Sequence, residues 1–219
     1  MKAGSSTNEK LVKSSDLAWI SVDDKKAWDA FSDIFWSSGV ADALADVIDL
    51  DAGVRLYSSF FVVRSHCSNP NYHTDWADSV GTNAFTLLAP LDDYATRDFH
   101  LLYSGERREG DEIHDSAGQQ LRQYVYRRGE ALTFASRFVH STEPGEAVEG
   151  ARAPHAFLCF TFGSDRAEHW GNILPTIGGY QSRILCRYDG DFELTDIGRH
   201  LRAEEVAAGK VVPTADVFA

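Results

Sequence analysis

A series of short apolar and aromatic segments, separated by turn residues, dominates the middle of this 219-residue chain. Each segment is rich in Phe, Tyr, Val, Leu or Ile, and Gly, Pro or Asp stands between one and the next. β-branched and aromatic residues favour strands, and strands of this length and spacing are typical of an antiparallel sandwich or barrel. We therefore predict a mainly β fold. Its expected strands are residues 54–64, 83–88, 99–103, 123–127, 131–134, 155–162 and 183–188.

Helical patterns flank this β region on both sides. Residues 23–35 repeat apolar side chains at helical intervals behind two acidic residues, and Gly39 follows where such a helix would end. Residues 40–48 predict a second helix. Residues 195–208 predict a C-terminal helix, which we expect to pack against the outside of a sheet.

The chain shows no repeat and no low-complexity linker that would divide it. We expect a flexible N-terminal tail over residues 1–15 and one domain over residues 16–219. That domain comprises a helical lead-in at residues 16–50, a β core at about residues 54–190 and the C-terminal helix.

The charge balance and the cysteines narrow the class of function. The net charge of −12 at pH 7 disfavours nucleic acid as a partner, because phosphates are neutralised by Lys and Arg. The three cysteines are widely spaced and form no C-x-x-C, so neither a disulfide framework nor a zinc knuckle is indicated. The polar N-terminus has no signal-peptide pattern, and no run of about 18 apolar residues occurs. We expect a cytoplasmic protein that does not cross a membrane.

A histidine and an aspartate stand two positions apart at the end of a loop, in the sequence Tyr72-His73-Thr74-Asp75-Trp76. In an extended chain, residues i and i+2 point the same way, so His73 and Asp75 can converge on one metal ion. A third ligand from elsewhere would complete one triangular face and leave the opposite positions open. His140 is the best candidate, because it follows a Gly-led turn and short strand at residues 129–139.

This pattern resembles the iron(II) and 2-oxoglutarate-dependent dioxygenase superfamily, with its His-x-Asp and distal His ligands. The resemblance covers roughly residues 57–163 and includes the strand at 83–88 and the phrase His140-Ser141-Thr142-Glu143-Pro144. It implies a double-stranded β-helix, the cupin-like jelly roll, with flanking helices. It also implies Fe(II), 2-oxoglutarate as cosubstrate and O2, with His73, Asp75 and His140 as the catalytic metal ligands.

The superfamily further implies an Arg or Lys beyond the distal His, which binds the far carboxylate of 2-oxoglutarate. Arg152 stands 12 positions after His140 in a Gly-x-Arg sequence, and a planar guanidinium can meet both carboxylate oxygens. Because Arg152 precedes Pro154 and the strand can start later, Arg64 and Arg183 are rival anchors.

Several neighbouring residues have expected roles that depend on this resemblance. Asn83 and Thr86 lie where the family often contacts the cosubstrate. Trp76 can line the substrate pocket or orient Asp75, and is equally compatible with an ordinary core position. Tyr72 and Arg64 are further candidates for contact with the substrate or for support of the metal ligands.

The function expected from these residues is hydroxylation, or another oxidation, of an unactivated C–H bond in a small molecule, with succinate and CO2 as co-products. The retained carboxylate at Asp75 disfavours halogenation, because the halogenating branch resembles this pattern with Gly or Ala there. The alternatives are a cupin-like metal enzyme that does not use 2-oxoglutarate and a non-catalytic jelly-roll binding protein. The substrate, the position oxidised and the oligomeric state are not predicted.

Overall fold

The computed structural model describes residues 17–21, 25–93, 99–104, 121–146 and 155–177. The helical elements and strands of these ranges, in chain order, are β1 (Leu17–Ser21), α1 (Lys25–Ser37), α2 (Val40–Leu44), β2 (Arg55–Arg64), β3 (His66–Cys67), η1 (Asp78–Val80), β4 (Ala84–Pro90), β5 (Leu101–Tyr103), β6 (Arg122–Tyr124), β7 (Leu132–Phe134), β8 (His140–Thr142), β9 (Gly145–Glu146), β10 (His155–Gly163), η2 (Ala167–His169) and α3 (Trp170–Ile177).

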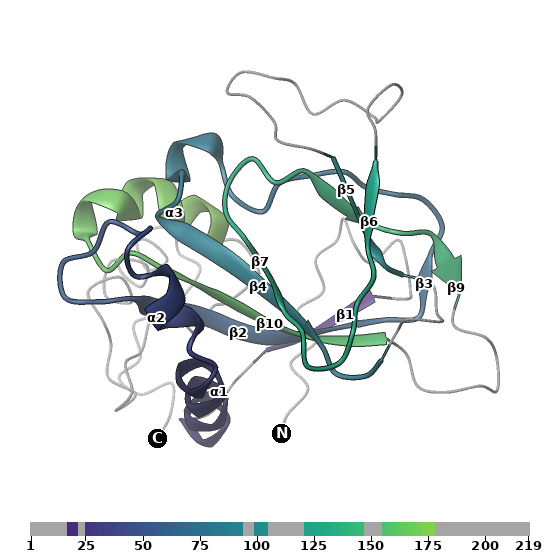
Figure 1. Ribbon diagram of the computed structural model, residues 1–219, viewed down its shortest axis with the longest axis horizontal. Helices are drawn as coiled ribbons and strands as arrows, with labels where there is room; N and C mark the ends of the chain where they lie inside the picture. Colours follow the sequence, from purple (N-terminus) through teal and green to yellow (C-terminus); the bar gives the residue numbers. More distant parts are fainter. Residues whose placement is uncertain (1–16, 22–24, 94–98, 105–120, 147–154, 178–219) are drawn as a thin grey trace, which may run out of the picture.

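The largest element is an antiparallel sheet of five strands in the order β1-β2-β10-β4-β7. A three-stranded sheet, β6-β5-β8, and a two-stranded sheet, β3-β9, lie beside it, and they occupy one side of the molecule in Figure 1. An isolated antiparallel bridge pairs His73 with His140 at the start of β8. The described chain is thus a mainly antiparallel, cupin-like β-sandwich with few helices.

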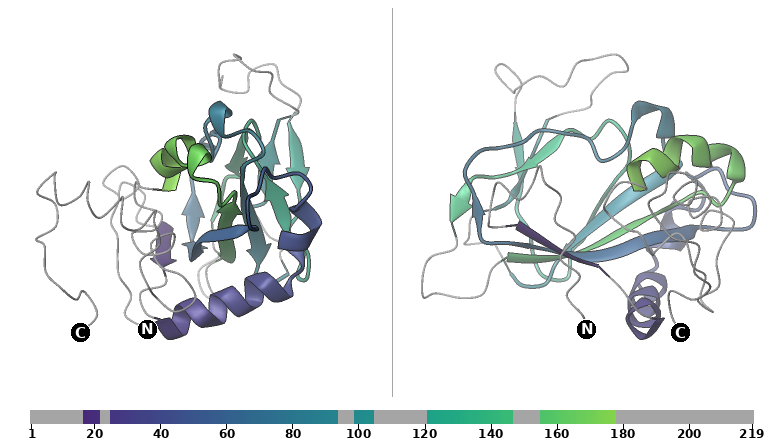
Figure 2. Two further views of the ribbon diagram at one scale, coloured as in Figure 1. Left: turned by 90° about the vertical axis from the view of Figure 1, so that its left-hand side faces the viewer. Right: turned by 180° about the vertical axis from the view of Figure 1, so that it is seen from behind.

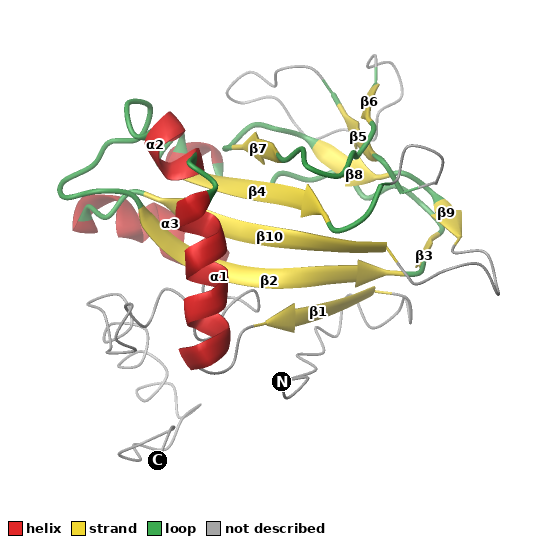
Figure 3. Ribbon diagram, turned by 60° about the horizontal axis from the view of Figure 1, so that its bottom comes forward, coloured by secondary structure: helices red, strands yellow, loops and turns green. Residues whose placement is uncertain are grey.

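The strands of the large sheet alternate between two faces, as period-2 geometry requires. On the outer face, Phe160 and Phe162 of β10 meet Phe35 of α1 at ring-centroid distances of 5.4 and 5.0 Å. Figure 3 shows α1 crossing this face of the sheet. On the inner face, Phe157 and Cys159 belong to a second buried cluster that also contains Phe60, Leu101 and Tyr126. The site described below lies on this inner side.

Most of the expected elements within the described residues are confirmed. The strands expected at 54–64, 83–88, 131–134 and 155–162 correspond to β2, β4, β7 and β10, and those at 99–103 and 123–127 to the shorter β5 and β6. The helix expected at 23–35 corresponds to α1.

Other expectations were wrong or incomplete. The helix expected at 40–48 ends at Leu44, where the backbone closes into a turn through a 2.9 Å hydrogen bond from Val47 N to Leu44 O. Strand β1 falls within the lead-in expected to be helical, and α3 was not expected at all. The strand expected at 183–188 and the helix expected at 195–208 lie outside the described residues.

None of the helices in the described ranges is both long enough and apolar enough to cross a membrane.

Candidate metal centre

The backbone brings the two candidate histidine ligands together. His73 N donates to His140 O and His140 N donates to His73 O, both at 3.0 Å, so the two residues form a closed antiparallel pair. Side chains of directly opposed residues project to the same face of a sheet. The two imidazole rings accordingly lie with centroids 4.5 Å apart. His73, a loop residue, is in this way placed beside His140, which stands 67 positions later in the chain.

Each imidazole is oriented by a carbonyl oxygen two residues before it. The Nδ1 of His73 lies 2.7 Å from Asn71 O, and the Nδ1 of His140 lies 3.0 Å from Phe138 O. A carbonyl only accepts hydrogen bonds, so each Nδ1 carries a proton and donates it. In the neutral ring this leaves the Nε2 lone pair available, which is the arrangement found in most metal-bound histidines.

Asp75 completes the group. Its Oδ1 lies 3.5 Å from His73 Nε2 and 3.6 Å from His140 Nε2. All three ligand atoms lie within 4.8 Å of one another. Ligands that share a metal at about 2.1 Å stand roughly 3 Å apart, so small side-chain shifts would close the set around one ion. The donor set, two imidazole nitrogens and one carboxylate, is the 2-His-1-carboxylate face that suits non-haem Fe(II).

Burial and neighbouring charges shift the pKa values of all three side chains. Burial tends to raise the pKa of Asp75, but hydrogen bonding to His73 and the nearby charge of His140 outweigh it, and the net shift is downward. Burial lowers the pKa of His140 and prevails over the opposing effect of Asp75. For His73, burial also works to lower the pKa, yet the hydrogen bond and charge of Asp75 leave it raised. Asp75 is therefore held as a carboxylate and His140 as a neutral imidazole.

The three side chains differ in their access to solvent. His140 is buried, with 7% of its side chain exposed, whereas 47% of the His73 side chain is accessible. Asp75 lies between them at 18%. The site therefore opens toward the surface on the His73 side.

Trp76, which follows Asp75 in the chain, contacts Thr86, a residue expected to bind the cosubstrate. The indole Nε1 of Trp76 donates to Thr86 Oγ1 at 3.0 Å. The Thr86 hydroxyl is also a minor contributor to the lowered pKa of Asp75. Both Trp76 and Thr86 are buried, at 1% and 3% exposure. Tyr72 is half-buried next to His73, and its role stays a prediction.

Asn83 lies apart from Thr86. Asn83 lies in the bend before β4. Its Oδ1 accepts a hydrogen bond from Asp49 N at 3.2 Å, and its Nδ2 lies 3.4 Å from His169 Nδ1. Its side chain thus belongs to a polar network outside the sandwich interior. Asn83 is therefore not part of the cosubstrate site that we propose below.

Arg64 lies on the inner side of the large sheet, whereas Arg152 and Arg183 lie outside the described residues. Arg64 is two and four positions beyond Val62 and Phe60, which face the inner cluster, and it pairs in register with His155 of β10. Its charge opposes the net rise in the pKa of both His73 and Tyr126. Of the rival anchors, Arg64 is the one that the described structure places near the triad.

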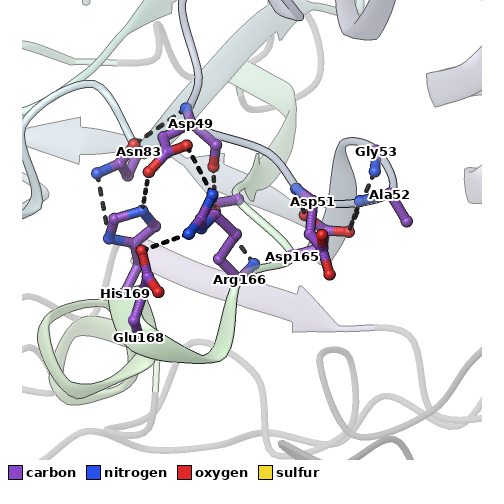
Figure 4. A network of polar contacts seen from close by, with 10 residues as sticks. Asp49, Asp51, Ala52, Gly53, Asn83, Asp165, Arg166, Glu168 and His169 are labelled. Carbon is purple, nitrogen blue, oxygen red and sulfur yellow. Dashed lines mark hydrogen bonds and ion pairs between the residues drawn. The ribbon is translucent and has the colours of Figure 1, made fainter.

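A second group of ligand-capable side chains, Asp49, Glu168 and His169, has a different character. Arg166 contacts Asp49 Oδ1 at 3.3 Å and Glu168 Oε1 at 2.8 Å, and His169 Nε2 contacts Asp49 Oδ2 at 2.8 Å. Figure 4 shows these contacts between the loop that follows α2 and the segment that follows β10. The carboxylates are already paired with a guanidinium, so we interpret this group as a clasp between two segments. No sequence motif marks it, because Asp49 stands more than 110 residues before Arg166 and His169.

No protein-family model matches this chain, and no curated protein matches it in sequence. Among solved structures, the chain is similar to HygX from Streptomyces hygroscopicus with iron bound, at 14% identity and a TM-score of 0.50, over 72% of this chain and 75% of HygX. It also matches AviO1 from Streptomyces viridochromogenes Tue57 at 15% identity and a TM-score of 0.43, and it spans about half of that protein, 52%.

A third match is SnoK, a non-haem alpha-ketoglutarate-dependent carbocyclase from nogalamycin biosynthesis, at 18% identity and a TM-score of 0.47, over 68% of this chain and 64% of SnoK. HygX has also been solved with nickel and 2-oxoglutarate bound. The structural neighbours are therefore non-haem iron and 2-oxoglutarate-dependent enzymes. At these identities, the likeness to HygX describes the fold of this chain.

Proposed function

We propose that this protein is an Fe(II)- and 2-oxoglutarate-dependent oxygenase whose metal is held by His73, Asp75 and His140. The observation that carries the proposal is the convergence of two Nε2 atoms and one carboxylate oxygen within 4.8 Å of one another on a sandwich fold. The similarity in fold to HygX, solved with iron, supports the choice of metal.

We further infer that the two sides of the sandwich are the halves of a double-stranded β-helix. Strands β2, β10, β4 and β7 would form one half. The bridge between His73 and His140 links the segment after β3 to β8, and β5 and β6 follow, so these would form the other half. The metal ligands then lie where the two halves face each other.

In this proposal each residue has a defined task. His73 and His140 would present to the metal their Nε2 atoms, which the Nδ1 hydrogen bonds orient, and Asp75 would supply the negative charge. Three ligands on one face leave the opposite coordination positions for a cosubstrate and O2. Iron(II) with 2-oxoglutarate and O2 would supply an oxidant for an unactivated C–H bond, with succinate and CO2 as co-products. A small molecule that reaches the centre from the open His73 side is the proposed substrate.

Arg64, Arg152 and Arg183 are the candidate anchors for the far carboxylate of 2-oxoglutarate, and the first two have specific support. Arg64 is supported by its inner-face register and by its electrostatic effect on His73. Arg152 is supported by the family spacing alone. Arg64→Gln and Arg152→Gln separate them: the true anchor should raise the KM for 2-oxoglutarate by roughly tenfold to a hundredfold, since a bidentate ion pair is worth about 1.5–3 kcal/mol. The other substitution should leave this KM within a few-fold of the wild-type value.

The experiment that tests the function is an assay of 2-oxoglutarate turnover. Wild-type protein with Fe(II) should form succinate in step with O2 uptake, and His73→Ala should not. His169→Ala is the matched control, because it removes a histidine from the clasp and leaves the triad intact. Unchanged turnover by His73→Ala would rule out the assigned centre.

The second candidate is a cupin-like metal enzyme that does not use 2-oxoglutarate. The same three ligands could hold the metal of such an enzyme, because they do not determine which molecule binds at the open coordination positions. Metal-loaded protein that oxidises or isomerises a substrate without 2-oxoglutarate, and that is indifferent to both arginine substitutions, would favour it. Metal-loaded protein that is inert toward a broad panel would instead favour a binding protein.

A further inference from the structure

The Ser141 hydroxyl bridges two backbone groups beside the candidate metal centre. Its Oγ accepts a hydrogen bond from Asn71 N at 2.7 Å and donates one to Thr142 O at 3.1 Å. In a regular antiparallel ladder, the hydrogen-bonded pair that follows His73 and His140 would be Asn71 and Thr142, joined directly from N–H to C=O. The hydroxyl therefore stands between a donor and an acceptor that a regular ladder would join.

The ladder is interrupted at this place because the register changes. Cys67 pairs with Gly145 and His73 pairs with His140, so the segment that follows β3 has one residue more than the segment opposite it. An extra residue on one side locally disrupts the ladder, as in a β-bulge. Figure 2 shows the segment between β3 and η1 beside the strands of the three-stranded sheet. Ser141, which is only 1% exposed, supplies the acceptor that the interrupted ladder lacks.

Asn71 connects this bridge to the first metal ligand. Its carbonyl oxygen lies 2.7 Å from His73 Nδ1 and accepts the proton of that nitrogen. Its N–H is held by Ser141, which lies in β8 directly after His140. Both polar backbone groups of Asn71 are thus bonded, and the acceptor that orients His73 is fixed to the strand that carries His140.

We propose that Ser141 is a positioning residue, resting on the function proposed above, which fixes the imidazole of His73 relative to His140. His140 begins a paired strand, and its Nδ1 bonds to Phe138 O of its own segment. His73 lies in a loop with 47% of its side chain exposed, so its orientation depends on what holds that loop. Groups that orient a metal ligand typically change metal affinity by about 10- to 100-fold when removed.

The test measures binding of Ni(II) to the metal-free full-length protein, without cosubstrate or turnover. Ser141→Ala removes the hydroxyl and should weaken Ni(II) binding by about 10- to 100-fold. Ser141→Cys keeps a weaker hydrogen-bonding group and should weaken binding by a smaller factor. The cysteine variant also decides the matter if the alanine variant does not fold.

Ser164→Ala is the matched control. Ser164 is fully buried, and its Oγ likewise accepts from a backbone N, that of Arg166, and donates to a backbone O, that of Asp49. It belongs to the clasp, so its substitution should leave Ni(II) affinity near the wild-type value. The proposal is overturned if neither substitution at Ser141 weakens Ni(II) binding, or if Ser164→Ala weakens it equally.

A second readout does not involve the metal. Long-range proton–nitrogen NMR spectra report which imidazole nitrogen carries the proton, at a pH well above the ordinary histidine pKa of about 6.5. The His73 signals, assigned by their loss in His73→Ala, should show Nδ1–H in wild type and in Ser164→Ala, and a larger share of Nε2–H in both Ser141 variants.

An unchanged His73 tautomer in the Ser141 variants would overturn the proposal even if the metal centre is correct. If the wild-type protein binds no Ni(II), the proposed function fails, and the tautomer still decides whether Ser141 orients His73.

Discussion

At the scale of the residue, Gly163 shows how closely two strands approach at the end of β10. A Cβ built there would lie 2.2 Å from Asn83 O and 2.7 Å from Ala84 Cα, both rigid backbone atoms. We expect Gly163→Ala to lower the free energy of unfolding by about 2 kcal/mol or more, since the strands must move apart. Gly171→Ala, whose Cβ would meet nothing within 4 Å on α3, should be neutral or stabilise by about 0.5 kcal/mol. Urea denaturation of both variants measures the difference, and equal effects would show that the strands tolerate a methyl group.

At the scale of the element, Phe35 docks α1 on the large sheet. It is fully buried against Phe160 and Phe162, whereas the adjacent Trp36 keeps 49% of its surface exposed. Phe35→Ala should cost about 3–5 kcal/mol of unfolding free energy, because it removes a large side chain from a packed cluster. Trp36→Ala should cost about 1 kcal/mol or less. Thermal and urea denaturation compare the two, and a larger loss for Trp36→Ala would contradict this view of how the helix docks.

At the scale of the whole molecule, Asp165 ties the segment after β10 to the turn before β2 (Figure 4). Its carboxylate accepts hydrogen bonds from the backbone N of Asp51, Ala52 and Gly53 at 2.8, 2.7 and 3.1 Å. Burial works to raise the pKa of Asp165, but these three bonds outweigh it and lower the pKa. A carboxyl group with a lowered native pKa stabilises the fold above its ordinary pKa, and this contribution is lost as the pH falls through the native value.

Asp165→Asn should therefore reduce the free energy of unfolding at pH 7 by about 1 kcal/mol, a modest value because the carboxylate is partly solvated. The difference from wild type should begin to shrink as the pH falls below about 4, the ordinary pKa of an aspartate, and should vanish once the pH is below the lowered native pKa. Urea denaturation across this pH range measures it. Asp46→Asn, at an exposed position, should change stability by less than about 0.5 kcal/mol. A difference that persists unchanged at pH 3 would argue against the charged cap.

Much of the sheet could be predicted from the chain alone, because strand patterns are local. β2, β4 and β10 are long apolar segments, and their buried faces are encoded by residues at spacing two. The short β3 and β9, each of two residues, carry too little local signal to be recognised. Strand β1 pairs with β2 along the whole of its length, and that pairing depends on a partner about 40 residues away. Helix α3 was missed because Pro175 lies inside it, and Pro usually argues against a helix.

For the candidate metal centre, too, some features could be predicted from the sequence and others could not. His73, Asp75 and the distal His140 were identified from their residue types and order, since the chemistry of a metal ligand belongs to the side chain and the i, i+2 spacing is local. That Asn83 and Thr86 contact the cosubstrate stays a prediction. The structure places the two side chains differently, because Asn83 lies in the bend before β4 and bonds to Asp49 and His169, whereas Thr86 lies in the strand. The sequence by itself thus determined which groups can bind a metal and which segments can form strands. Only the tertiary structure decided that the His73 and His140 backbones pair, that Trp76 bonds to Thr86, and that Asn83 joins the clasp, because each depends on through-space contacts that local residue patterns do not encode.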